Sequence, residues 1–142
     1  MKRFLNIALL FFLIYCSNTL LAQGDKDKIE ALRVSFISKK TELTAGESEK
    51  FWPIYNEYND KVKAVRKNLR QSYKKKYENL TEKDAEELYL LEIQSKQAEL
   101  DLFKQYGEKI KSVIGIKKLS RLHLAEEEFK REIINSIKEK SD

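Results

Sequence analysis

The most constraining feature of the sequence is a run of apolar and aromatic residues that recur at every third or fourth position. Successive members of the run are 4, 3, 4, 3, 4, 4 and 4 residues apart. They are Phe51, Tyr55, Tyr58, Val62, Val65, Leu69, Tyr73 and Tyr77. This spacing places one apolar seam along a single helix, as in a coiled coil. It therefore predicts a helix over residues 44–77, about 50 Å long at 1.5 Å per residue.

Two short motifs predict where the long helices begin. Thr44 stands three residues before Glu47, and Thr81 stands three residues before Asp84. In a capping box, the first side chain accepts a hydrogen bond from the fourth backbone N–H, and the fourth side chain accepts one from the first N–H. The second motif opens a helix with the apolar stripe Leu88, Leu91, Ala98, Leu102, Tyr106, Ile110 and Val113. Gly115 is expected to end this helix in a left-handed conformation.

Two shorter helices complete the expected all-α fold. A first helix is predicted over about residues 26–40, and a fourth follows Gly115 with the stripe Leu119, Leu122, Phe129, Ile133 and Ile137. Pro53 removes one backbone donor and crowds the carbonyl of Glu49, so we expect the second helix to kink there. The chain has four Gly and one Pro, which is too few for a fold rich in tight turns. We predict a single domain over residues 23–142, in which the two long helices form an antiparallel hairpin.

The first 22 residues have the pattern of a secretory signal peptide. Lys2 and Arg3 supply the positive charge, and the run from Phe4 to Cys16 is almost entirely apolar. Cleavage after Ala22 would release a periplasmic protein that begins at Gln23. The alternative is an uncleaved leader that anchors the chain in the inner membrane, although its apolar core is shorter than the ~20 residues that span a bilayer.

The composition provides few residues for catalysis or metal binding. The chain has one His and one Cys, and Cys16 lies inside the leader. Catalysis needs a nucleophile with a base, or paired carboxylates in a dry pocket, and the sequence shows neither pattern. His123 stands alone on a charged helix, whereas metal sites use several ligands. We therefore expect no enzymatic activity, no cofactor, no metal site and no small-molecule substrate.

The strongest charge feature is a run of cations in the second half of the helix predicted over 44–77. Half of the residues from 61 to 76 are Lys or Arg, and none is acidic. Four of them share one side of a helix and are candidates for binding acidic or unfolded proteins: Lys63, Lys67, Arg70 and Lys74. In the alternative, the cations complement the helix dipole and pair with the acidic start of the next helix. An exported protein meets no nucleic acid, so that partner is not expected.

Trp52 is the second candidate for partner binding. It lies off the seam that contains Phe51, Tyr55 and Tyr58, so we expect it to be exposed or to lie at a dimer contact. Aromatic side chains offer a large contact area together with a polar edge. Packing in the core is the alternative for this group of aromatic residues.

Two capped long helices in a small, charged, exported chain resemble the Spy/CpxP family of periplasmic proteins, which carries the LTXXQ motif. Leu-Thr pairs precede both helices, although Glu47 and Asp84 replace the glutamines of the motif. The stretches FWPIYNEY at residues 51–58 and RLHLAEEEF at residues 121–129 resemble a subgroup labelled sensors of ECF-type sigma factors.

The resemblance implies a thin, curved, often dimeric cradle that binds unfolded or stress-related envelope proteins without ATP. It also implies either a chaperone or a regulator that reports envelope stress to a membrane-bound sigma-regulatory protein. A membrane-anchored signalling or structural module is the alternative function, and a periplasmic metal sensor is a further, weaker one.

Overall fold

The computed structural model describes residues 27–76 and 79–139. Within these ranges the chain is helical apart from short connections, and no strand is present. The helices are residues 27–41, α2 (Ala45–Lys76) and α3 (Glu82–Glu139). The predicted all-α fold class is confirmed. The predicted count of four helices is not confirmed, because the residues after Gly115 continue in α3.

The described residues form two compact units within the stretch that the sequence predicted as one domain. The first unit contains the residues up to Lys40 together with those from Ala125 onward. The second unit contains Thr41–Leu124 and therefore holds the whole of α2 and most of α3. The leader predicted over residues 1–22 and Tyr77 of the predicted seam lie outside the described residues.

Capping boxes start both long helices, as predicted. At α2, the Thr44 N–H donates to a Glu47 carboxylate oxygen at 2.7 Å, and the Glu47 N–H donates to the Thr44 hydroxyl at 3.3 Å. At α3, the Asp84 N–H donates to the Thr81 hydroxyl at 3.2 Å, and that hydroxyl donates to the Asp84 carboxylate at 2.6 Å. Each box satisfies backbone N–H groups that have no partner inside the helix.

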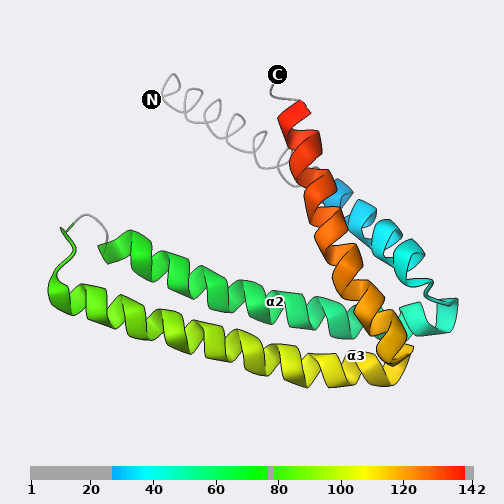
Figure 1. The fold of residues 1–142 in the computed structure, drawn as a ribbon, viewed down its shortest axis with the longest axis horizontal. Helices are drawn as coiled ribbons and strands as arrows, with labels where there is room; N and C mark the ends of the chain where they lie inside the picture. The colour runs from blue at the N-terminus through cyan, green and yellow to red at the C-terminus, as the bar shows by residue number, and fades with distance from the viewer. Residues whose placement is uncertain (1–26, 77–78, 140–142) are drawn as a thin grey trace, which may run out of the picture. The chain divides into compact units, whose positions relative to one another are not determined.

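Within the second unit, α2 and the first part of α3 lie side by side as the predicted antiparallel hairpin (Figure 1). The rings of Tyr58 and Tyr106 lie 5.7 Å apart. Farther along α2, an Arg66 nitrogen lies 2.6 Å from a Glu99 oxygen. Still farther, the Tyr73 hydroxyl donates to Glu92 at 3.0 Å. Later residues of α2 thus meet earlier residues of α3, as an antiparallel pair requires.

The core of the second unit is concentrated toward the start of α2. Phe51, Tyr55 and Val62 of the predicted seam are buried, whereas Tyr73 near the end of α2 is 38% exposed. On α3 the buried apolar residues of this unit are Leu88, Tyr106, Ile110, Ile114 and Leu122. Two thin helices cover only one side of each other, so the seam is less buried where no third segment lies against it.

Gly115 forms a kink within α3, with a helical stretch before it and another after it. Its φ of 77° and ψ of 162° are not helical, and such a positive φ with an extended ψ is accessible essentially only to glycine. Phe103 and His123 would lie about 30 Å apart on a straight helix. Their ring centroids are 5.4 Å apart. Residues 116–124 of the second unit therefore turn back toward the preceding part of α3.

Pro53 lies inside α2, and the helix continues through it from Ala45 to Lys76. The kink expected at this position stays a prediction.

In the first unit, residues 27–40 pack against the last part of α3. The rings of Phe36 and Phe129 lie 5.6 Å apart, and the Lys40 ammonium lies 2.6 Å from a Glu128 oxygen. This ammonium lowers the pKa of Glu128 below its ordinary value. Leu32 of the first helix and Ile137, the last residue of the stripe predicted after Gly115, are exposed, so the apolar residues of this unit are only partly covered.

Candidate functional site

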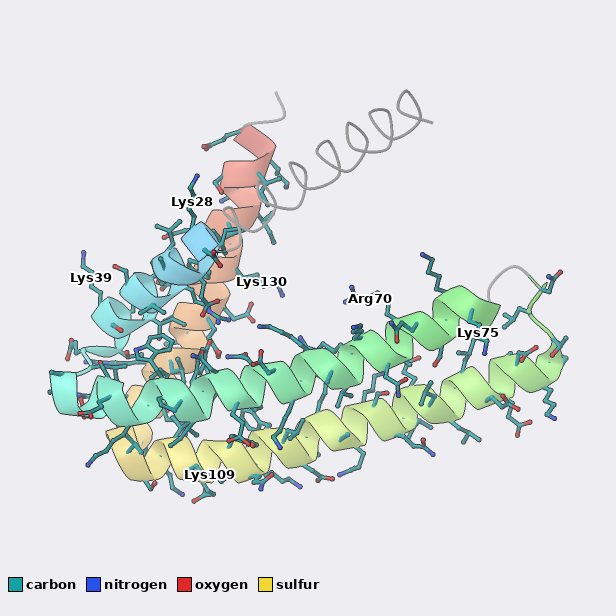
Figure 2. All side chains as sticks on the ribbon, turned by 180° about the vertical axis from the view of Figure 1, so that it is seen from behind. Lys28, Lys39, Arg70, Lys75, Lys109 and Lys130 are labelled. Atoms are coloured by element: carbon teal, nitrogen blue, oxygen red, sulfur yellow. The ribbon has the colours of Figure 1, made fainter. Side chains whose placement is uncertain are left out.

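The four cations Lys63, Lys67, Arg70 and Lys74 form a stripe along one flank of α2, which we call the basic stripe. Lys63 and Arg70 follow directly after the seam residues Val62 and Leu69. One residue of helix turns the side chain by about 100°, so the basic stripe lies beside the seam and not on it. Figure 2 shows Arg70 on a side of α2 that does not face α3. All four side chains are exposed.

Ion pairs occupy only part of the cation run. Lys61 pairs with Glu57 at 3.5 Å and Arg66 pairs with Glu99 at 2.6 Å, so acids outside the run neutralise them. Lys63 lies 3.3 Å from Asp60, but both side chains are mostly exposed, and such a pair contributes little. Within the described ranges 27–76 and 79–139, the remaining cations of the basic stripe make no ion pair. These are Lys67, Arg70 and Lys74.

The alternative prediction, pairing of the run with the acidic start of α3, does not account for these three cations. Asp84 is engaged by Thr81 in the capping box. Glu82 and Glu86 are exposed, and neither makes an ion pair with the residues that the structure describes. Glu99, which lies well inside α3, pairs with Arg66 of the run.

Trp52 is half-buried and lies on the same flank of α2 as the basic stripe, three turns before Lys63. Its ring packs edge-on against Phe51 at 4.9 Å and against Tyr55 at 5.4 Å. The indole is thus held by the core on one side and accessible on the other. The indole is therefore partly packed in the core, and the dimer contact considered for it from the sequence stays a prediction.

On the hairpin, a shallow groove of about 490 Å³ lies between α2 and α3. Its lining residues are Lys61, Ala64, Val65, Ala98, Asp101, Leu102 and Gln105. Small side chains at Ala64 and Ala98 leave room between the helices, and the groove has an apolar floor with charged edges. Sequence analysis did not single out this groove, because it depends on which residues of two helices become neighbours.

A network around Glu47 ties the start of α2 to the residues that follow Gly115. The Lys118 ammonium donates to both Glu47 carboxylate oxygens, at 2.9 and 2.6 Å, and to the Glu42 carbonyl at 2.8 Å. The hydrogen bond from Lys118, with that from the Thr44 N–H, lowers the pKa of Glu47 to about 2. Arg121 pairs with the Glu42 carboxylate at 2.6 Å.

Glu42 itself has a φ of 53°, an unusual left-handed conformation for a residue other than glycine. Sequence analysis treated Glu47 only as a capping residue and did not identify Lys118 as its partner.

Comparison with known proteins yields no match to a family model, a curated protein or a solved structure. Within the described ranges, no helix is long and apolar enough to span a bilayer. The same residues hold no group of three or more His, Cys, Asp or Glu side chains placed to bind a metal ion.

Proposed function

We propose that this chain is a non-enzymatic, exported envelope-stress protein of the Spy/CpxP type that binds unfolded or regulatory partner proteins. The observation that carries the proposal is the set of three neighbouring exposed cations, Lys67, Arg70 and Lys74, which have no ion pair within the described ranges. Adjacent positive charges repel one another, and only Lys74 lies in the last turn of α2, where a cation complements the helix dipole. A partner with negative charge would supply the missing counter-charges.

The partner surface comprises the basic stripe together with Trp52 on the same flank of α2. Exposed cations attract acidic or extended chains at long range, and the effect weakens as salt shortens the screening length to about 10 Å and below. The indole then adds apolar contact with a polar edge. Long-range attraction by the cations and apolar contact by the indole together suit a protein that binds many different chains instead of one fixed ligand.

The proposal includes export, with cleavage after Ala22, and a four-helix cradle as the mature form. Either an ATP-independent chaperone or a sensor of an ECF-type sigma factor system would use such a surface, the sensor by contacting a membrane-bound sigma-regulatory protein. A sigma factor gene and an anti-sigma gene beside this one would favour the sensor. Retention of the uncleaved leader would instead favour a membrane-anchored module.

A fourfold variant tests the basic stripe directly: Lys63→Gln, Lys67→Gln, Arg70→Gln and Lys74→Gln. The matched control removes four exposed lysines elsewhere, at Lys39, Lys50, Lys83 and Lys117. Both variants lose the same charge, so a difference between them reports position and not net charge. We expect the stripe variant to lose most suppression of aggregation of an unfolding client, and the control to retain it. If the stripe variant folds normally and suppresses aggregation as well as the wild type, the four cations do not bind the client and are only exposed to solvent.

A further inference from the structure

Two rows of exposed side chains run along one side of the hairpin, one row on each long helix. The row on α3 is apolar, and we call it the α3 row: Tyr89 is 64% exposed, Ile93 is 48% exposed and Leu100 is 44% exposed. The row on α2 is the basic stripe, whose four cations are exposed. Large apolar groups in one row mark an interaction surface more often than single ones do.

Contacts between the two helices show that both rows lie on the same side. The Arg66–Glu99 ion pair crosses from α2 to α3 on this side. At about 100° per residue, Arg66 lies about 40° around α2 from Val62, and the basic stripe lies about 80–140° in the same direction. On α3, Glu99 lies about 20° from the buried Tyr106, and the α3 row lies about 100–140° in the same direction. A flat surface laid across this side of the hairpin would therefore touch both rows.

Two shallow grooves lie on the other side of the hairpin. Val65 and Leu102 line the groove of about 490 Å³ and lie about 40–60° around their helices in the opposite direction. A second groove, of about 370 Å³, has Ser72 and Gln94 in its lining. Neither lining includes a residue of the two rows. The rows are thus a separate surface of the hairpin.

The acids that lie between the two rows are neutralised within the hairpin. Glu99 pairs with Arg66 at 2.6 Å, and Glu92 pairs with Lys96 at 2.9 Å. The hydrogen bonds that Glu92 accepts from Lys96 and from the Tyr73 hydroxyl lower its pKa below the ordinary value. Three cations of the basic stripe make no ion pair with the residues that the structure describes. This side of the hairpin therefore combines uncompensated positive charge with an apolar row.

A bilayer that contains anionic phospholipid would satisfy both rows at once. Its phosphates lie directly above the first acyl carbons, so cations and apolar side chains on one face of a helix pair can reach both layers. Tyrosine, as at Tyr89, is enriched at this interface. A folded protein partner would need a row of acids and a row of apolar groups at matching positions, whereas a fluid bilayer needs no such match. The exposed acids Glu82 and Glu86 bound the surface toward the start of α3.

We propose that this side of the hairpin binds the surface of an anionic phospholipid bilayer, with the basic stripe at the phosphates and the α3 row at the acyl boundary. The contact is peripheral and reversible, because only three apolar side chains enter the lipid. It shares the basic stripe with the proposed function, whereas the α3 row serves the bilayer alone. Binding would bring the chain to the surface where a membrane-bound sigma-regulatory protein lies.

Sedimentation with lipid vesicles tests the contact. Vesicles of phosphatidylcholine with about one third phosphatidylglycerol are compared with vesicles of phosphatidylcholine alone, and we expect about tenfold or more tighter binding to the anionic vesicles. Raising the salt from about 0.1 to about 1 M shortens the screening length from about 10 to about 3 Å and should weaken the binding. All variants share one N-terminus with the wild type, so differences between them report on the hairpin.

A triple variant tests the α3 row: Tyr89→Ser, Ile93→Ser and Leu100→Ser. The matched control removes three other exposed apolar side chains, at Leu90, Ile116 and Leu124. We expect the row variant to bind anionic vesicles about tenfold more weakly and the control to bind as the wild type does. Both should still suppress aggregation of an unfolding client, because the basic stripe and Trp52 are intact, so this proposal and the proposed function can fail separately. Circular dichroism checks that each variant is folded.

A fluorescent label tests which side of α3 meets the lipid. In a Cys16→Ser background, Leu100→Cys carries an environment-sensitive dye on the α3 row. The control Gln94→Cys places the same dye in the lining of the second groove. We expect anionic vesicles to shift the emission of the dye at position 100 to shorter wavelength and to leave the emission at position 94 unchanged.

Two results would overturn the proposal. One is a wild-type chain that binds anionic vesicles no better than neutral ones. The other is a folded row variant that binds anionic vesicles as tightly as the wild type, because the contact would then depend on charge alone and the α3 row would be left for a protein partner.

Discussion

At the scale of single residues, the hydrogen bonds from Lys118 to Glu47 make stability depend on acid pH. They hold the pKa of Glu47 at about 2, below its ordinary value of 4.5. Because the folded pKa is lowered, the stabilisation is present above about pH 4.5 and is lost as pH falls toward 2. We expect Lys118→Met to lower the free energy of unfolding at pH 7 and to flatten its decline over that range. Urea unfolding at a series of pH values measures this, with the exposed neighbour Lys117→Met as control. If the free energy of unfolding of Lys118→Met declines with falling pH as steeply as that of the wild type, the prediction is wrong.

Also at this scale, the hydroxyl groups of Thr44 and Thr81 cap the two long helices. We expect Thr44→Ala and Thr81→Ala each to lower the free energy of unfolding by about 0.5–2 kcal/mol, because backbone N–H groups lose their acceptor. Thr→Ser at either position keeps the hydroxyl and should cost little. Urea unfolding measures the change. An alanine variant with full stability that no longer binds partner would show that the hydroxyls serve recognition instead.

At the scale of helices, Gly115 is the residue at which α3 has a kink. Its positive φ and extended ψ are essentially restricted to glycine. We expect Gly115→Ala to lower the free energy of unfolding by about 1–3 kcal/mol. Gly46 lies in the first turn of α2, and a Cβ atom there would meet nothing within 4 Å. Gly46→Ala is therefore the matched control and should be neutral or slightly stabilising. If Gly115→Ala and Gly46→Ala were equally stable, the kink at residue 115 would not require a glycine.

Pro53 is the second helix-scale feature, because it removes one hydrogen bond from the interior of α2. We expect Pro53→Ala to raise the free energy of unfolding by about 1–3 kcal/mol. If the predicted kink shapes the partner surface, the same change weakens binding of an unfolding client. The exposed neighbour Asn56→Ala is the control for loss of surface contacts. A more stable variant with unchanged binding would show that the proline is dispensable to function.

At the scale of the whole molecule, the leader predicted over residues 1–22 would decide where the protein acts. We expect the exported chain to begin at Gln23 and to be recovered with soluble periplasmic proteins. N-terminal sequencing of the protein purified from the periplasmic fraction checks the cleavage site. Full-length chain in the inner membrane would contradict the prediction and support the anchored alternative.

The sequence by itself determined the features that depend on residues within about four positions of one another. The capping boxes at Thr44 and Thr81 are of this kind, since each joins residues three apart. The seam that begins at Phe51 is another, because its spacing alone specifies a long helix and its buried side. The break in helical geometry at Gly115 could also be predicted locally, because glycine adopts a positive φ more readily than other residues.

Tertiary structure alone decided which charges are neutralised and which apolar groups stay uncovered. Arg66 is paired because Glu99, 33 residues away, lies opposite it in the hairpin, while Arg70 on the next turn pairs with no acid among the residues that the structure describes. Glu47 binds Lys118, 71 residues away, only because α3 folds back after Gly115. Tyr89, Ile93 and Leu100 are exposed because one neighbouring helix covers only one side of α3. Contacts between distant residues depend on helix register and direction, which the spacing of residues within one helix does not specify.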